Sequence, residues 1–277
     1  MVKMVVCIKQ VPLVSELPWN PKTGTLQRDL AEGMMNPACR SALDTALRIK
    51  ETSEGGEITA ITMGPPMAEE ILREAIALGA DRGVLLSDRK MAGADTSVTS
   101  YTMARAIEKA CPACDLVLCG MSTSDSETAQ VGPQLAEELD IPGVAYVGEL
   151  AIAGRTVRMQ RFTDNFIETL EMDLPGLVTV TTGRYAPRHV PLSGLQRAFS
   201  EADILCLDAV ALGLDPERIG AKGSATKILN VYSPTEGKKN IVLTGAPKRI
   251  VEQLFERFDD KIGGAIGKDL KTDKKSK

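Results

Sequence analysis

The first half of the chain alternates short apolar runs with longer segments of helical periodicity. The apolar runs are rich in β-branched residues and leucine, and they fall at 4–9, 57–64, 83–88 and 115–120. Between them, apolar residues recur every three or four positions in segments that begin at Asn36-Pro37, near Met67, near Asp95 and at about Thr128, the last ending at Glu138. Such alternation predicts a Rossmann-like α/β fold, with a parallel sheet covered by helices on both faces.

The pattern changes after Pro142. Residues 143–162 contain two alternating segments separated by a glycine, which predicts a hairpin, and residues 166–182 predict one further strand. These strands would form an antiparallel addition to the parallel core. Two segments without clear periodicity, Val11–Met35 and Arg184–Arg197, are interpreted as loops, the first a functional loop because of its length and the second an exposed one.

The last third of the chain has two short strand-like runs, Ile204–Leu207 and Lys227–Val231, and then a helix that starts at Ala246-Pro247. One face of this helix is apolar over several turns. Such a stripe suits either docking against a partner or packing on its own domain. The predicted organisation is an α/β domain at 1–200, a C-terminal arm and helix at 201–265, and a basic, disordered tail at 266–277.

Composition narrows the function classes. The net charge of −4 disfavours a nucleic-acid partner, because phosphate binding needs a basic field. No apolar run reaches the roughly 18 residues of a spanning helix, and the N-terminal run has no signal-peptide cleavage site, so we expect a cytoplasmic protein. The pair Cys111 and Cys114 is a lone Cys-x-x-Cys at a predicted helix end, and we predict neither a metal site nor a catalytic residue from it or from the single histidine, His189.

The segment CGMSTSDSETAQVGPQLAEEL, residues 119–139, follows a predicted buried strand and enters a predicted helix. Ligands of open parallel sheets bind outside the carboxyl ends of the strands, where helix amides are unpaired. Gly120 allows a sharp turn, Asp125 can accept from a ribose hydroxyl or a loop amide, and Thr128 with the amides that follow it can hold a phosphate. A solvated Ser/Thr loop with a simple N-cap is the alternative, and spacing alone leaves both open. The chain has neither Gly-x-Gly-x-x-Gly after a strand nor a P-loop.

The same segment resembles the CGxQAIDGDTAQVGP nucleotide-binding loop of electron transfer flavoprotein β subunits. Further stretches follow in the order of that family, and the resemblance covers about residues 3 to 265. They are VVCIKQVP, NPKTGTLQR, MNPACRSALDTALRIKE, ALGADRG, DTSVTSYTMA and RFTDNFIETLEMDLPGLVTVT. The resemblance implies an adenine-nucleotide α-hydrolase-like fold and a heterodimer with an α subunit that carries the redox FAD, on which the C-terminal arm docks.

Within that family the β subunit binds either AMP or a second FAD. The resemblance implies a set of cofactor-binding residues along the carboxyl edge of the sheet and the loops beside it. They are Cys7, Ile8, Lys9, Arg28, Asn36, Met63, Gly64, Asp95, Thr96, Cys119, Gly120, Asp125, Thr128, Ala129, Gln130 and Val131. It also implies a partner-recognition loop at PRHVPLSGLQRA, with Arg188, Pro191 and the anchoring Leu192.

NPKTGTLQR is similar to the DPxTGTLxR pattern of the electron-bifurcating branch, with Arg28 as a cation beside a flavin. We therefore expect FAD, with NADH as transient hydride donor and an acyl-CoA dehydrogenase, ferredoxin or flavodoxin as partner. The alternative is a non-bifurcating β subunit with structural AMP that serves dehydrogenases and a quinone reductase. A third reading is a small nucleotide-dependent enzyme or stress-type adenine-binding protein on the same scaffold.

Overall fold

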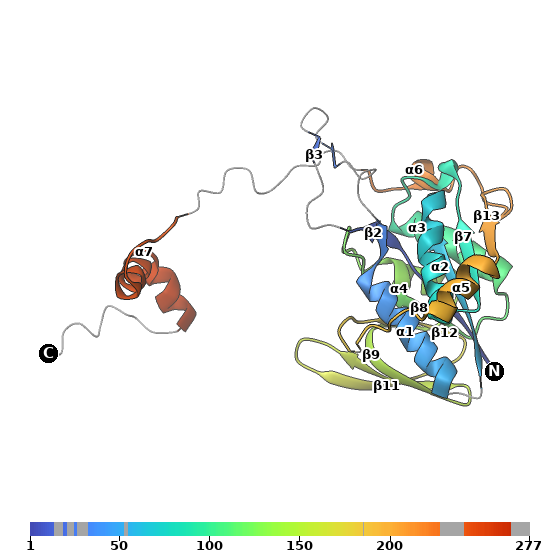
Figure 1. The fold of residues 1–277 in the computed structure, drawn as a ribbon, viewed down its shortest axis with the longest axis horizontal. Helices are drawn as coiled ribbons and strands as arrows, with labels where there is room; N and C mark the ends of the chain where they lie inside the picture. Colours follow the sequence, from blue (N-terminus) through green and yellow to red (C-terminus); the bar gives the residue numbers. More distant parts are fainter. Residues whose placement is uncertain are drawn as a thin grey trace. The chain divides into compact units, whose positions relative to one another are not determined.

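A nine-stranded sheet organises the larger of two units into which the chain divides, Met1–Asn230 and Val231–Lys277. Figure 1 shows the fold of this computed structural model, which describes residues 1–13, 19–20, 25–26, 33–52, 55–184, 186–227 and 241–266. Each unit is described by itself.

The strand order of the sheet is β11-β10-β9-β12-β8-β1-β6-β7-β13. Every neighbouring pair from β9 to β13 in this order is parallel, and β10 is antiparallel to both β9 and β11. The bounds are β1 (Val2–Cys7), β6 (Gly56–Met63), β7 (Arg82–Leu86), β8 (Leu116–Gly120), β9 (Gly143–Ala153), β10 (Thr156–Phe162), β11 (Ile167–Asp173), β12 (Gly176–Val180) and β13 (Ile204–Leu207). The predicted parallel α/β core with an antiparallel addition is confirmed.

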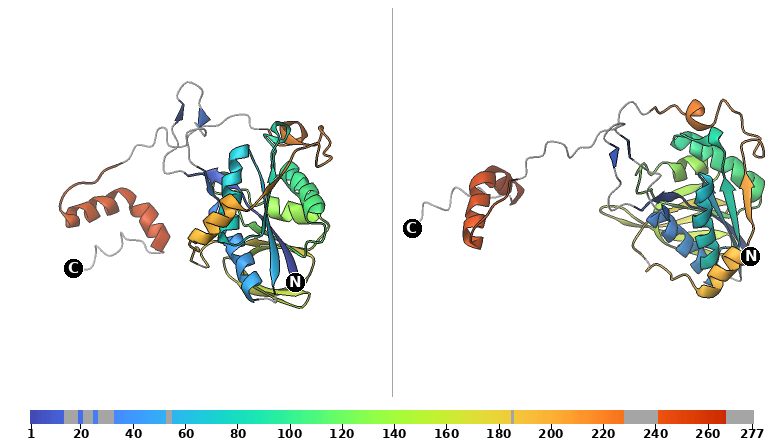
Figure 2. Two further views of the ribbon diagram at one scale, coloured as in Figure 1. Left: turned by 45° about the vertical axis from the view of Figure 1, so that its right-hand side comes forward. Right: turned by 45° about the horizontal axis from the view of Figure 1, so that its top comes forward.

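Helices cover both faces of the sheet, as Figure 2 shows from two sides. On one face, α1 (Pro37–Thr52) and α2 (Glu69–Leu78) pack in one core cluster with Met4 and Val6; on the other, α3 (Thr96–Ala110) and α4 (Val131–Glu138) pack with Val5 and Cys7. Alternate residues of β1 thus enter opposite cores, as in any strand buried on both faces. A helix α5 (Leu192–Ser200) lies on α2.

The order of the strands creates a switch point at β1. The chain runs from β1 outward through β6 to β7, and then returns to the other side of β1 to form β8. Cys7 and Cys119 are paired in the register of β1 and β8, so the carboxyl ends of these two strands lie side by side. In open α/β sheets, ligands bind in the crevice at such a reversal.

The region after Pro142 holds one strand more than predicted. Residues 166–182 form two strands, β11 and β12, separated by a cis Leu174-Pro175 bond, and β12 returns to the parallel core between β8 and β9. The register of β9 against β12 shifts near Tyr146, which has φ of 61° and donates its amide to Thr179 Oγ1 at 3.0 Å. The purely antiparallel reading of this region is therefore wrong for β12, whose fully buried GLVTV run is typical of a central parallel strand.

Two predicted helix boundaries need correction. The helix predicted from Thr128 begins only at Val131, because Glu127 and Ala129 have φ of 49° and 55°, outside the helical region. A short 3-10 helix, η2 (Pro66–Ala68), precedes α2, so the segment near Met67 starts as a tighter turn. A second 3-10 helix, η3 (Arg89–Met91), and a single turn, α6 (Gly220–Gly223), lie in connections.

Two predicted loops contain regular structure. Residues 192–200 of the predicted loop at 184–197 form α5, whose apolar residues recur at helical spacing after Pro191 at the N-cap. The predicted functional loop at 11–35 includes two short ladders, β2 (Gln10–Pro12) with β5 (Gly33–Met35) and β3 (Trp19–Asn20) with β4 (Thr25–Leu26). Most of the predicted strand Lys227–Val231 lies outside the described residues.

The second unit contains the predicted C-terminal helix, α7 (Pro247–Ile266), which is kinked where Phe258 leaves helical geometry. Val251, Leu254 and Phe255 are exposed on it. Within the described ranges, every helix is too short or too polar to cross a membrane.

Candidate functional site at the carboxyl edge of β1 and β8

Lys9 and Asp125 meet at the switch point. Lys9 follows β1, Asp125 lies in the loop after β8, and Lys9 Nζ donates to both carboxylate oxygens at 2.8 Å. Burial alone would raise the pKa of Asp125, but hydrogen bonds from Lys9, Thr123 and Ser126 outweigh it and lower that pKa. Asp125 is therefore ionised at neutral pH, and its Lys9 partner places a cation at the ligand edge of the sheet.

Asn36, at the start of α1, holds the loop after β8. Its side chain is buried, and its Nδ2 donates to the carbonyl of Ser122 at 2.8 Å while its Oδ1 accepts from the amide of Ser124 at 3.0 Å. Its backbone amide donates to the carbonyl of Lys9 at 2.9 Å. The side chain of Asn36 thus fastens the loop after β8, and its main chain ties the segment that follows β1.

The stretch from Thr128 to Val131 presents main-chain amides in sequence. Within the described part of the chain, none of these four amides donates a hydrogen bond to an acceptor. The left-handed conformations of Glu127 and Ala129 interrupt the turn just before α4, and successive amides in alternating conformations form concave anion sites. Since Pro133 has no N–H, the amides before it carry this function, and the donor set fits the phosphate of a nucleotide.

Asp95 and Thr96, at the start of α3, form hydrogen bonds on one side of the carboxyl edge of the sheet. Asp95 is the N-cap of α3, and its carboxylate accepts from the amides of Val98 and Thr226, both at 3.0 Å. These amide hydrogen bonds, that from Val98 foremost, lower the pKa of Asp95. Thr96 Oγ1 donates to Gln130 Oε1 at 2.9 Å. The carboxylate of Asp95 is committed to capping, and Thr96 orients the loop beside the amides.

The remaining predicted cofactor-binding residues lie at the edge with their main chain, and their side chains are not placed to bind a ligand there. Cys7 and Cys119 are buried in the core, and a hydrogen bond from Cys119, with burial, raises the pKa of Cys7 well above its ordinary value. Ile8 and Gly64 continue the ends of β1 and β6 through backbone bonds to Ile61 and Leu86.

Met63, the last residue of β6, is partly buried at the same edge. Gly120 is needed for packing, because a Cβ there would lie 2.6 Å from the backbone of Ala38 and Cys39. Arg28 lies outside the described residues. Ser122 and Ser124, the points where Asn36 holds the loop, were not predicted; their position within a hydroxyl-rich loop was the available signal.

The predicted partner-recognition residues lie elsewhere, at the start of α5. Leu192 is its first residue and is 83% exposed, and Pro191 precedes it in an extended conformation. Arg188 is turned inward: its Nη1 and Nη2 donate to Glu51 at 2.5 and 2.8 Å. A contact of Arg188 with a partner stays a prediction.

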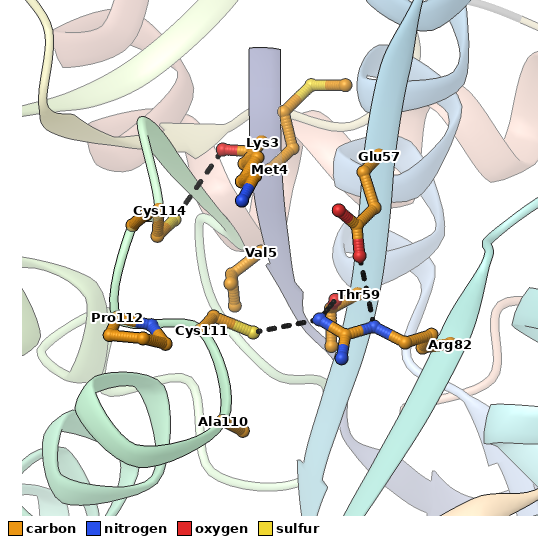
Figure 3. Close-up of a pocket in the computed structure, with 11 residues that line it drawn as sticks. Lys3, Met4, Val5, Glu57, Thr59, Arg82, Ala110, Cys111, Pro112 and Cys114 are labelled. Atoms are coloured by element: carbon orange, nitrogen blue, oxygen red, sulfur yellow. Dashed lines mark hydrogen bonds and ion pairs between the residues drawn. The ribbon is translucent and has the colours of Figure 1, made fainter. Parts of the chain in front are cut away.

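The cysteine pair lies at the opposite edge of the sheet. A cavity of about 230 Å³ lies beside the starts of β1, β6 and β7. Cys111 and Cys114 are on its wall (Figure 3). Cys111 accepts from Arg82 at 3.9 Å, and Cys114 donates to the carbonyls of Lys3 and Leu116. Burial raises the pKa of Cys114 to about 12, so this thiol is protonated and a poor nucleophile. No group of three or more potential metal ligands occurs among the described residues.

Comparison with known proteins covers most of the chain. Residues 23–203 match the family model described as "Electron transfer flavoprotein domain". The "Electron transfer flavoprotein subunit beta" of Thermoanaerobacterium thermosaccharolyticum is 40% identical over 258 residues, which cover 93% of this chain and 98% of that protein. The "Caffeyl-CoA reductase-Etf complex subunit CarD" of Acetobacterium woodii is 39% identical over 94% of this chain and 98% of its own length. "Protein FixA" of Sinorhizobium fredii is 38% identical, with 91% and 90% covered.

Proposed function

Because this chain belongs to the electron transfer flavoprotein β-subunit family, and is therefore an electron carrier, we propose that it binds FAD at the edge formed by β1 and β8. In this proposal it receives electrons from NADH and passes them toward the flavin of an α subunit in a heterodimer. The observation that carries the proposal is the set of amides from Thr128 to Val131, which donate to no acceptor among the described residues, beside the cation of Lys9.

The residues at the carboxyl edge of β1 and β8 would each contribute differently to nucleotide binding. The four amides and Lys9 would hold the phosphates, and Thr128 would add a hydroxyl. Asp125 keeps Lys9 in place and can exchange that contact for a ribose hydroxyl. Asn36 keeps the loop in the conformation that presents the amides, because it fixes both Ser122 and Ser124. When bound, a flavin at this edge supplies one- and two-electron redox chemistry.

The choice of FAD over AMP, and of a bifurcating role, is the finer part of the proposal. It is supported by the resemblance of NPKTGTLQR to the bifurcating pattern and by a relative named as part of a caffeyl-CoA reductase complex. The sequence identities of that relative and of "Protein FixA" to this chain are almost equal, at 39% and 38%, so identity alone does not favour one of them. By analogy with the named complex, an acyl-CoA-type dehydrogenase or reductase is the proposed partner, docking at Leu192.

Nucleotide content tests this proposal directly. The chain is purified together with its α subunit, and the released nucleotides are identified and counted. FAD at about two per heterodimer supports the proposal. One FAD with one AMP replaces it by the structural-AMP alternative, and absence of both flavin and AMP from the β site overturns it.

Side-chain variants test the site itself. Lys9→Met removes the cation and Thr128→Ala a hydroxyl, and each is expected to weaken nucleotide retention by about 1 to 3 kcal/mol, the usual effect of losing a buried or charge-assisted hydrogen bond. Thr163→Ala is the matched control, since Thr163 bonds only to the nearby Phe166 carbonyl in the hairpin turn after β10. Equal nucleotide content in all three variants after extended dialysis would contradict the site.

A further inference from the structure

Charged side chains of α1 surround Arg188, which lies four residues before Leu192. Glu51 accepts from both terminal nitrogens of Arg188, and Asp44 Oδ1 lies 3.7 Å from its Nε. Arg40 adds a contact from the same helix, because its Nη2 donates to the carbonyl of Arg188. Both the guanidinium and the main chain of Arg188 are therefore held by one face of α1.

Asp44 is the buried member of this cluster. Its side chain is 4% exposed and lies between two guanidinium groups, since Arg40 Nε is 3.9 Å from the same Oδ1. Neither contact is a hydrogen bond, and burial raises the pKa of Asp44 although Arg40, Arg188 and Arg48 favour its ionised form. A buried ion pair adds little to folding stability compared with an apolar pair of the same volume, although removal of one partner leaves the other charge uncompensated. What Asp44 does supply is a negative charge that keeps two cations together.

Residues beyond Arg188 are fixed at two further points. Val190 packs against the core of the α1 and α2 face, and Gly194 lies so close to α2 that a Cβ there would be 2.0 Å from the carbonyl oxygen of Ala77. Between these two points the chain turns outward, and Leu192 projects with 83% of its surface exposed. An exposed apolar side chain on a segment held at both sides is pre-organised for docking, because little entropy is lost when a partner binds.

We propose that Asp44 is a positioning residue for partner docking: through Arg188 it holds the segment 188–192 in the conformation that presents Leu192 to the redox partner. This inference rests on the proposed function, since it assigns a role within the docking of a partner at Leu192. Asp44 does not contact the partner itself, because it is buried beneath the segment. Its effect is therefore expected on the apparent affinity for the partner and not on the flavin.

The test uses the complete flavin-loaded heterodimer and compares Asp44→Asn, Arg188→Gln and the double variant. If Asp44→Asn leaves the segment correctly placed only a fifth of the time, the KM for the heterodimer as substrate of the partner dehydrogenase rises about fivefold. We expect kcat and flavin content to stay at wild-type values. The melting temperature is measured alongside, because removal of one partner of a buried ion pair lowers folding stability. Because Asp44 acts through Arg188, the double variant should have the same KM as Arg188→Gln alone.

Two further measurements keep positioning separate from docking. Trypsin cleavage of the folded protein after Arg188 should be faster in Asp44→Asn than in the control Asp81→Asn, which breaks the ion pair of Asp81 with Lys50 of α1 at a distance from the segment. Unchanged cleavage in Asp44→Asn overturns the inference whatever the partner does, and so does an unchanged KM beside a raised KM for Leu192→Ala. If Leu192→Ala also leaves KM unchanged, the proposed docking site itself fails, and the role of Asp44 with it.

Discussion

Replacing Asn36 tests how the ligand edge is built. Asn36 is 1% exposed and makes two hydrogen bonds to main-chain groups of the loop after β8, one as donor to Ser122 and one as acceptor from Ser124. Asn36→Ala removes both and leaves a carbonyl and an amide without partners. An unsatisfied group of this kind costs about 1 to 3 kcal/mol. Because this loop is only partly buried and water can reach it, we expect a total loss of about 2 to 4 kcal/mol in the free energy of unfolding.

Asn36→Asp separates the two hydrogen bonds. The new carboxylate still accepts from the Ser124 amide, but its second oxygen faces the Ser122 carbonyl, and only the protonated acid can donate to it. Burial and this contact favour the protonated form, so the pKa of the new side chain in the folded protein should be raised. Stability is then highest below the pKa of the unfolded chain and falls as the pH rises through the folded-state pKa. The variant should therefore be close to wild type at pH 4 and clearly weaker at pH 8 (both values chosen to bracket a raised carboxyl pKa).

Equilibrium urea unfolding measures these losses, and hydrogen exchange of the Ser124 amide reports the loop directly. Thr45→Val is the control, because Thr45 is also buried on α1 but bonds only to the Ser41 carbonyl of its own helix. An Asn36→Ala variant as stable as Thr45→Val, with a Ser124 amide still protected, would refute the reasoning. So would an Asn36→Asp variant whose stability does not change with pH.

Two other predictions follow from contacts already described. The pKa of Asp125 is lowered in the folded protein, so the stability that this carboxylate contributes is complete above its unfolded pKa and is lost as the pH falls through the folded value. The urea midpoint of Asp125→Asn should therefore depend less on pH in the acid range than the midpoint of the wild type. Equal pH dependence of the two midpoints would contradict this. Gly194→Ala would place a Cβ 2.0 Å from the Ala77 oxygen, which requires α5 to move away from α2 at a cost of about 1 to 3 kcal/mol. Thermal unfolding measures that cost, and faster proteolysis near Leu192 should accompany it; an unchanged melting temperature would mean that α5 does not need this close approach.

The strands of the central sheet were predicted from the sequence more accurately than the boundaries of the helices. Buried parallel strands are continuous apolar runs, and these identified β1, β6, β7 and β8 without ambiguity. The start of α4 was predicted three residues early because backbone conformation decides it: Glu127 and Ala129 adopt positive φ, which neither residue type favours. Helix α5 was missed because a glycine interrupts it, and the reason for Gly194 is a contact with α2 that is remote in sequence.

For the candidate site, too, some features could be predicted from the sequence and others could not. Its proposed location after β8 and the roles suggested for Asp125 and the amides near Thr128 follow from the position of polar residues at a strand end, whereas Lys9 was included only through the family resemblance. The hydrogen bonds of Asn36 could not be predicted, because they join residues 86 and 88 positions apart. Likewise, Arg188 looks like an exposed loop arginine in the sequence, and only the fold brings it to Glu51 and Asp44.

Helix α1 links two regions that the chain keeps far apart. Asn36 stands at its first end and secures the ligand edge, whereas Glu51 stands near its other end and grips Arg188. Sixteen residues of helix make a rod of about 24 Å. Since the close approach of Gly120 also locks β8 against this rod, its tilt and position are not free. This one helix thus sets the spacing between the proposed nucleotide-binding edge and the proposed partner-docking segment, so a displacement of one end would displace the other.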